Sequence, residues 1–470
     1  MITPLLHPDR LFPADPGLRS IARELYAEVA ELSIVSPHGH TDPKWFAENL
    51  AFSNAASLFL TPDHYVLRLL RSRGITYDAL GVPRKDGAPV ADARSAWRAL
   101  CEHWSLFAGT PSELWLNHSL SQFFGIEEPL SEKTADTTYE LITDKLQSPE
   151  LRPLAVLDRA SVEMIATTEF ALDPLDHHKT IIANGLGQRI RTTYRPDDVT
   201  DPDAPGFADN LVRLGALTGE DTSNWAGLIK AHASRRAYFR EHGATATDHG
   251  VPTARTADLS LIEKQALLDA ALKGTLDANG AEQFRAQMLT EMAALSAEDG
   301  MVTQIHAGSR RATDPVLQAE RGRNLGDDIP VRTDFVGGLQ ALLGRFGNSE
   351  NFRLLVFTLD ESTYARELAP MAGYWPALMV GPPWWFHDSP NGIRRYLDAM
   401  QETAGFHNLA GFNDDTRALL SIPARHDVWR REVCSYLARL VAEHRVSRPT
   451  AATLARWLSY DAAKAAYKMP

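Results

Sequence analysis

The pattern of hydrophobic and polar positions divides the chain into a short first part, a long helical part and an alternating part. Residues 18–32 carry apolar side chains at helical spacing and lead into the short apolar run 32–36, which predicts a helix followed by a strand. From about residue 43 to residue 147 the pattern is helical, with almost no strand candidates. Predicted helices there are 64–73, 91–107, 112–124 and 135–146.

After residue 150, strand-like runs alternate with helical segments. Together with 32–36, the strand candidates are 162–168, 189–194, 244–247, 301–305, 352–357, 377–380 and 408–412. Helices are predicted between them, among others at 209–217, 257–271, 281–295, 334–346 and 393–402. Strands that alternate with helices predict a parallel sheet, and eight such units are the number that closes a barrel.

These patterns predict an α/β fold, a (β/α)8 TIM barrel with an all-α insertion after the first strand and extra C-terminal helices. Residues 1–42 would supply the first helix and barrel strand, 43–150 the insertion, and 151–470 the rest of the barrel. The tail from 430 to 467 is too long for one closing helix and predicts two.

Composition and charge narrow the possible functions. Hydrophobic residues are 44% of the chain, and no run approaches the roughly 20 apolar residues of a membrane span. The net charge of −12 disfavours nucleic acid as a partner. Only Cys101 and Cys434 occur, which excludes a zinc site built from cysteines and fits a reducing cytoplasm. The N-terminus lacks the pattern of a signal peptide, which also predicts a cytoplasmic protein.

The strongest chemical signal is the pair His38 and His40, which follows the strand predicted at 32–36. Residues two apart on a strand point to the same side, so the two imidazoles would converge as half of a zinc or manganese site. Taken alone, the pair fits a surface loop better than a metal site. Other predicted strands, however, also end in ionisable residues. They are Arg195 with Asp197, Asp248 with His249, His306, and Asp414 with Asp415.

All strand ends of a (β/α)8 barrel meet on one face, so these residues are candidates for a common site. No lysine follows the fourth strand, and a carboxylated lysine bridging two metals is therefore not expected. One metal, held by His38, His40 and a carboxylate such as Asp415, is the simpler hypothesis. Each residue also has a structural alternative. His249 and His306 could bond strand ends, Asp414 or Asp415 could cap a helix, Trp384 and Trp385 could be core, and Arg195 could pair with Asp197 or Asp198.

At these residues the sequence resembles uronate isomerases of the amidohydrolase superfamily over nearly its whole length. The resembling blocks are His38-Gly39-His40, Asp63-His64-Tyr65 with Arg68, Arg195-Pro196-Asp197, Asp248-His249-Gly250, Gln304 to Gly308 with Arg311, Trp384 to Asp388, Asp415-Thr416-Arg417, and Arg425-His426. The Trp-Trp-Phe block and the Asp-x-Arg block are specific to this family, whereas the first histidine pair is shared by the whole superfamily.

The resemblance implies a metal-dependent aldose–ketose isomerase that interconverts D-glucuronate and D-fructuronate, and D-galacturonate and D-tagaturonate, by proton transfer through an enediol. It implies one divalent metal, zinc, on His38, His40 and Asp415, and a homo-oligomer. The implied catalytic residues are Asp415, Tyr65, His64 and Arg417, and the implied substrate-binding residues are Arg195, His306, Arg311 and Trp384.

Two other classes of function remain open. A metal-dependent hydrolase of the same superfamily would use His38, His40 and Asp415 to activate a water molecule. The third possibility is a non-catalytic protein that binds sugar acids. The block Asp63-His64-Tyr65 and the several candidate pocket arginines favour the isomerase, because hydrolysis does not need them.

Overall fold

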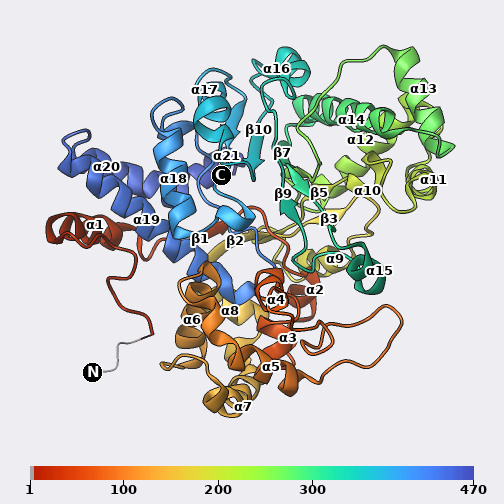
Figure 1. The fold of residues 1–470 in the computed structure, drawn as a ribbon. Helices are drawn as coiled ribbons and strands as arrows, with labels where there is room; N and C mark the ends of the chain where they lie inside the picture. The colour runs from red at the N-terminus through yellow and green to blue at the C-terminus, as the bar shows by residue number, and fades with distance from the viewer. Residues whose placement is uncertain (1–4, 470) are drawn as a thin grey trace.

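Short parallel strands lie at the centre of the computed structural model, which describes residues 5–469, and helices surround them (Figure 1). One sheet has the strand order β1-β2-β4 and a second has the order β11-β10-β7-β6-β5-β3. The strands are β1 (Ile34–Ser36), β2 (Val162–Ala166), β3 (Glu169–Phe170), β4 (Ile190–Arg191), β5 (Tyr194–Arg195), β6 (Ala246–His249), β7 (Val302–Ala307), β10 (Leu354–Thr358) and β11 (Leu378–Val380).

The two sheets adjoin each other because two chain segments each contribute one strand to both sheets. β2 and β3 are separated only by Thr167 and Thr168, and β4 and β5 only by Thr192 and Thr193. Every pairing within the two sheets is parallel, as in the register of Val356 opposite Ile305. The predicted parallel α/β architecture is therefore confirmed, and seven of the eight strand candidates overlap observed strands.

The eighth candidate, 408–412, is wrong as a full strand. Within residues 5–469 it contributes a single parallel bridge, between Leu409 and Val380. Gly411 has a φ of +75°, which bends the chain out of the extended conformation. A side chain at this position would come within 2.6 Å of the backbone of Ala463, so α21 (Ala462–Ala466) packs directly on the bend. Beyond the bend, the segment contacts the end of the first strand, because His40 donates its backbone N–H to the carbonyl of Thr416 over 3.0 Å.

The stretch between β1 and β2 contains helices and loops and no strand in the described chain. Its α-helices are α2 (Pro43–Glu48), α3 (Ala55–Phe59), α4 (His64–Arg71), α5 (Ala93–Glu102), α6 (Pro111–Phe124), α7 (Ala135–Leu146) and α8 (Pro153–Arg159). The side chains of Asp42, Asn54, Asp63, Asp92 and Thr110 accept backbone hydrogen bonds where the first five begin. In Figure 1 these helices form the red and orange group below the strands.

Further helices lie around the strands in Figure 1, and one of them, α9, packs against α2. They are α9 (Asp176–Ala183), α10 (Asp197–Thr200), α11 (Phe207–Thr218), α12 (Trp225–Glu241), α13 (Leu261–Leu272), α14 (Ala278–Asp299), α15 (Pro315–Arg321), α16 (Gln340–Phe346), α17 (Ala369–Ala372) and α18 (Pro390–Met400). An antiparallel pair, β8 (Ser309–Arg310) and β9 (Ile329–Pro330), lies in the long loop after β7.

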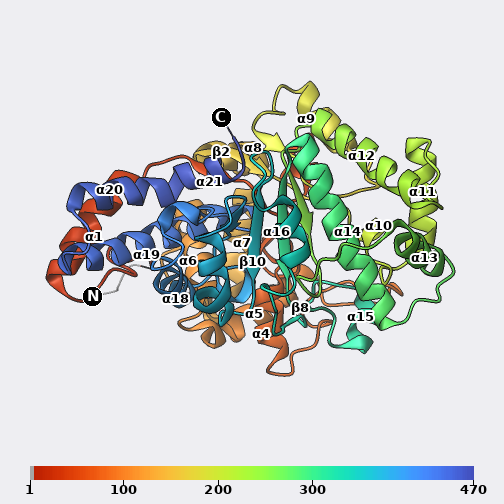
Figure 2. The ribbon, with the colours of Figure 1, turned by 90° about the horizontal axis from the view of Figure 1, so that it is seen from above.

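The C-terminal tail is longer in helix than predicted. It contains α19 (Ile422–Ala442), α20 (Arg448–Arg456) and then α21, joined to α20 by a π-helical turn at 457–461. Residues 422–442 and 448–466 thus form two continuous helical stretches, as predicted, although the first begins at Ile422 and not near residue 430. The N-terminal helix α1 (Pro16–Val29) packs along α19 and α20, and the three form the projecting arm in Figure 2. Among the described residues, no helix combines the length and apolar character needed to cross a membrane.

Candidate metal centre and active site

Three of the predicted site residues converge where β1 ends. Nε2 of His38 lies 3.4 Å from Oδ1 of Asp415, and Nε2 of His40 lies 3.2 Å from the same oxygen. The buried strand β1 leads into His38, which is itself buried, and two residues later into His40, which is 24% exposed. Asp415 has a φ of +40°, a conformation that costs free energy in a residue other than glycine and that is concentrated at functional sites.

The donor set fits a divalent cation. Oδ1 of Asp415 is buried and accepts no well-aligned hydrogen bond within residues 5–469, although two imidazole nitrogens face it. Burial lowers the pKa of His38 to about 4, which leaves a neutral imidazole at neutral pH. Burial alone would raise the pKa of Asp415, but His38 and His40 outweigh it and hold the pKa below its usual range. Neutral imidazoles and an ionised carboxylate are the states that bind metals.

A second pair of side chains completes the buried cluster. His306, near the end of β7, stacks on His38 with ring centroids 4.8 Å apart, and its Nδ1 lies 2.7 Å from Oδ1 of Asp248. Nε2 of His306 is buried and has no hydrogen-bond partner in the described chain. Ligand atoms of His38, His306 and Asp415 lie within 4.8 Å of one another, as do those of His38, His40 and Asp248.

Arg195 links this cluster to α10. Its guanidinium donates to Asp248 over 2.9 Å and to Asp197 over 2.8 Å. Burial would raise the pKa of Asp248, but Arg195 and then His306 hold it well below the usual range. A side chain at position 250 would collide with the guanidinium of Arg195, so Gly250 allows this close approach. Arg195 therefore forms the ion pair with Asp197 that the structural alternative predicted. It also lies beside the candidate site.

Helix α4 brings His64 and Tyr65 to the same region. The side chain of Asp63 caps the helix by accepting from the backbone N–H of Tyr65 at 2.9 Å. The Tyr65 hydroxyl donates to the carbonyl of Trp385 at 2.8 Å and lies 3.3 Å from Oδ2 of Asp388. Burial, and then the neighbouring Arg417, lowers the pKa of His64 to about 3. His64 is therefore neutral at neutral pH.

Arginine side chains gather beside Asp415. Burial lowers the pKa of Arg417, and the charge of Asp415 opposes this effect. The charges of Arg195 and Arg311 lower the pKa further, so these two guanidiniums are close enough to repel that of Arg417. No carboxylate lies within 4 Å of Arg417 in the described part of the chain, whereas Arg311 is 3.5 Å from Asp328. An unpaired guanidinium among other cations is suited to bind an anionic ligand.

The tryptophans are both buried and close to the candidate site. Trp384 meets the ring of His306 edge-on at 4.8 Å, and Trp385 lies edge-on to His64 at 5.5 Å. The guanidinium of Arg311 lies 5.3 Å from the centre of the Trp385 ring. Trp385 has a φ of +53°. The core interpretation of these residues is correct. The structure also brings Trp384 next to His38, His40 and His306, which together form the histidine cluster.

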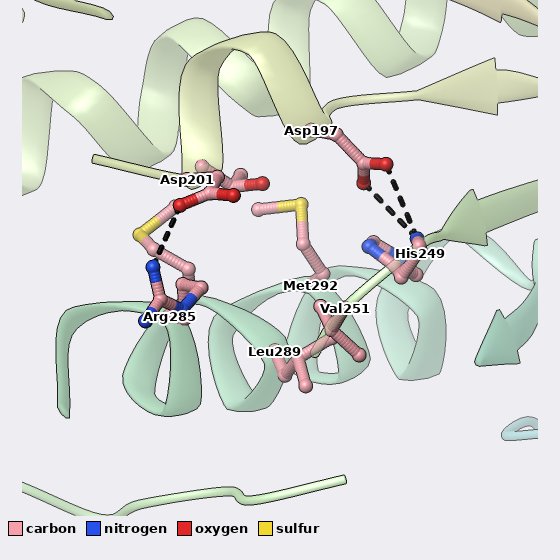
Figure 3. Close-up of a pocket in the computed structure, with 10 residues that line it drawn as sticks. Asp197, Asp201, His249, Val251, Arg285, Leu289 and Met292 are labelled. Carbon is pink, nitrogen blue, oxygen red and sulfur yellow. Dashed lines mark hydrogen bonds and ion pairs between the residues drawn. The ribbon is translucent and has the colours of Figure 1, made fainter. Parts of the chain in front are cut away.

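Two other candidates have structural partners. Asp414 does not cap a helix: its Oδ2 lies 3.2 Å from Nε2 of His426. His249 is buried, and its Nε2 lies 3.0 Å from the hydroxyl of Thr247. His249 also lines a separate small pocket (Figure 3), where Asp201 pairs with Arg285 over 2.8 Å. The structural alternative therefore applies to His249.

Four residues outside the predicted catalytic, substrate-binding and metal-ligating sets also lie at the site. Asp248 orients His306, and Gln304 places its Nε2 at 3.5 Å from Nδ1 of His38. Asp388 contacts Tyr65 and is ion-paired with Arg425. Asp248 directly follows a predicted strand, beside His249, and this position could have indicated its role at the site. The contacts of Asp388 and Arg425 depend on tertiary packing and leave no trace in local spacing.

Comparisons with known proteins identify the family. The family model of glucuronate isomerase matches residues 18–467. The uronate isomerase of Rhizorhabdus wittichii is 57% identical over 464 residues, which cover 99% of this chain and 98% of that protein. The crystal structure of glucuronate isomerase from Caulobacter crescentus has a TM-score of 0.97 at 50% identity and covers 99% of this chain and 97% of that one.

The uronate isomerase structure from Thermotoga maritima has a TM-score of 0.91 at 29% identity, with 98% of this chain and 99% of that chain covered. Similarity therefore extends over essentially the full length of both proteins in each comparison, in sequence as well as in fold. The chain belongs to the uronate isomerase family and is an isomerase.

Proposed function

We propose that this chain interconverts D-glucuronate and D-fructuronate, and D-galacturonate and D-tagaturonate, by proton transfer through an enediol at a single metal centre. The observation that carries the proposal is the convergence of His38, His40 and Asp415 beside an unpaired arginine, Arg417. A sugar acid that reacts at a carbonyl needs both features, because its reacting oxygens must be polarised and the negative charge that develops on them must be stabilised.

His38, His40 and Asp415 would hold one zinc ion. When bound, the cation supplies Lewis-acid polarisation of a substrate oxygen. Two imidazole nitrogens and one carboxylate oxygen match the ligand types that zinc prefers. His40 is the most exposed of the three, which leaves the substrate an approach from its side. The buried His306 stacks on His38 from the other side and restricts how that imidazole can turn.

Asp415 would move the carbon-bound proton between C2 and C1. Its lowered pKa keeps it ionised at neutral pH, as a base must be before it acts. While C2 loses its proton, the carbonyl oxygen at C1 gains negative charge, and Arg417 is placed to stabilise that charge. The hydroxyl proton then has to pass from the oxygen on C2 to the oxygen on C1. Tyr65, with the neutral His64 stacked on its ring at 4.5 Å, would carry it.

The remaining predicted residues would bind the rest of the sugar acid. Arg311 and Arg195 contribute positive charge beside Arg417, although both are already paired with carboxylates. His306 offers an unpartnered Nε2 as a hydrogen-bonding atom, and Trp384 lies edge-on against it. The preference between glucuronate and galacturonate would then depend on hydroxyl contacts near these side chains.

The proposal includes a distorted (β/α)8 barrel that presents these residues on one face. The strand order, the bridge from Leu409 to β11 and the hydrogen bond from His40 to Thr416 support a closed path of eight segments. In this arrangement residues 43–150 form an insertion that carries His64 and Tyr65 over the barrel mouth. We further propose that the protein is a cytoplasmic homo-oligomer.

A metal-dependent hydrolase would use the same three ligands, and a binding protein would use the same arginines. The position of α4 favours the isomerase, because hydrolysis by a metal-activated water does not require His64 and Tyr65 against Trp385, with the charges of Asp415 and Arg417 acting on His64. The test is an assay for ketose formation from D-glucuronate and from D-galacturonate with metal-replete protein. Ketose from either sugar supports the proposal; metal-replete protein that binds both sugars without converting them contradicts it.

A further inference from the structure

We propose that Asp388, held by Arg425, is the positioning residue for Tyr65 and takes up its phenolic proton during turnover. This inference rests on the proposed function, because it concerns the hydroxyl proton that the isomerisation must move. Its basis is a largely buried Tyr65–Asp388–Arg425 triad beside the candidate site, formed by three segments far apart in sequence.

The contacts of the triad fix the Tyr65 hydroxyl. It donates to the carbonyl of Trp385 over 2.8 Å, and Oδ2 of Asp388 lies 3.3 Å away as a second acceptor. Asp388 pairs with Arg425 through the same oxygen. Arg425 in turn lies over the ring of Trp115 at 3.6 Å and reaches the backbone carbonyl of Asp414, the neighbour of Asp415, at 3.5 Å.

This arrangement gives a balanced proton path. The oxygen of Tyr65 accepts the hydroxyl proton of the substrate's C2 oxygen, while its own proton passes to Oδ2 of Asp388. When the C1 oxygen is protonated, both transfers run in reverse, so Tyr65 and Asp388 end as they began. No electron donor or acceptor is required. A buried hydrogen-bonded network suits this task because its members are held in place before reaction.

The electrostatics of the triad support the path. Burial raises the pKa of Asp388 to about 7, although Arg425 opposes the rise. The charge of Asp415 raises the pKa of Asp388 further, and the hydrogen bond from Tyr65 lowers it. The arginines of the adjacent helix α18 are paired elsewhere, Arg394 with Glu432 and Arg395 with Glu361. A carboxylate that titrates near neutral pH can both accept and return a proton during turnover.

The chain contains a matched control for this triad. Tyr26, Asp427 and Arg431 form a second buried Tyr–Asp–Arg cluster between α1 and α19: Tyr26 donates to Asp427, and Arg431 donates to the same carboxylate at 2.9 Å. Asp427 lies away from the histidine cluster. Asp427 is also ion-paired with Arg10. Asp388→Asn and Asp427→Asn each remove a carboxylate held between a tyrosine and an arginine, and only the first should affect Tyr65.

The experiment is a double-mutant cycle with kcat, KM, metal content and the pH profile of kcat as readouts. Asp388→Asn should lower kcat about 10- to 100-fold, with KM changed less than about threefold and metal content unchanged. In the Tyr65→Phe background, the same substitution should lower kcat by less than about twofold. The acid limb of the wild-type kcat profile, near pH 7, should be lost in Asp388→Asn, because protonated Asp388 cannot accept the proton.

Asp427→Asn should leave kcat and its pH profile close to those of the wild type. If Asp388→Asn does not fold, Asp388→Glu, which keeps the charge but moves it, should lower kcat in the wild-type background and not in Tyr65→Phe. An equal loss of kcat in both backgrounds, or no loss in either, overturns the role of Asp388. Wild-type protein that converts neither uronate would instead overturn the proposed function, so the two failures are distinct.

Discussion

Nε2 of His40 lies 3.2 Å from Oδ1 of Asp415, although one residue follows the first strand of the chain and the other follows the last sheet-forming segment. The contact brings the two ends of the strand series together at one buried oxygen. His38 faces the same oxygen from 3.4 Å. A cation bound at this point would replace two weak imidazole–carboxylate contacts by stronger metal–ligand bonds. Removal of the cation should therefore have a measurable effect on the protein.

We predict that the double substitution His38→Ala/His40→Ala abolishes stoichiometric binding of one divalent metal, most readily zinc. Elemental analysis of the purified protein measures the content directly. The thermal midpoint should fall less than activity does, since the hydrophobic core does not depend on an ion at the end of the strands. His249→Ala is the control, because His249 is buried nearby but bonds Thr247. A double variant that retains full metal content would show that other residues hold the ion.

Arg417→Met should cripple turnover while the fold remains intact. Loss of a guanidinium that binds a charged oxygen in a desolvated site typically costs about 2–5 kcal/mol, which lowers kcat/KM by at least about 30-fold. Steady-state kinetics with D-glucuronate and a circular dichroism spectrum provide the two measurements. The control is Arg345→Met, which removes a surface partner of Asp258. A kcat/KM close to that of the control would mean that Arg417 is structural.

Stability should fall as the pH drops below 6.5, partly because of His232. Burial lowers the pKa of this fully buried side chain to about 3, with Arg236 acting in the same direction. Between pH 6.5 and about 3 the unfolded chain therefore binds a proton that the folded chain does not, so folding loses about 1.4 kcal/mol per pH unit from this one group.

Denaturant unfolding of wild type and His232→Gln at pH 7, 6 and 5 measures this effect. Glutamine can still accept from Tyr194, which lies 2.9 Å from Nδ1 of His232, but it does not titrate. The variant should show a flatter dependence of unfolding free energy on pH than the wild type. His444→Asn, at an exposed loop position, should keep the wild-type slope. Parallel curves for His232→Gln and wild type would refute the assignment.

Much of the fold could be predicted from the sequence because the signals are local. Buried parallel strands are short apolar runs, and the candidate at 352–357 coincides closely with β10, Leu354–Thr358. The helix predicted at 135–146 matches α7. The eighth strand failed because Gly411 bends the chain against α21, a tertiary contact that no hydrophobic pattern encodes.

The candidate site was predictable only in part, for the same reason. His38 and His40 share a side because of strand periodicity, and Asp415 was a candidate because it follows the last predicted strand. The partner of Asp414 is His426, on a helix that packs in from the C-terminal part of the chain. Arg425 reaches Asp388 and Trp115 from that same helix. Such contacts depend on how distant elements pack, so spacing along the chain does not reveal them.

In the proposed function a uronate is isomerised by proton transfer, with Asp415 as the base. The most direct test is to run the wild-type reaction in D2O and measure deuterium at C1 of the ketose, together with loss of label from C2-deuterated substrate. A carboxylate that carries the proton exchanges it with solvent in a fraction of turnovers. If Asp415 carries the proton, solvent deuterium should appear at C1 and the C2 label should be lost, both increasing with the number of turnovers. A product without solvent deuterium, and complete transfer of the C2 label over many turnovers, would contradict it.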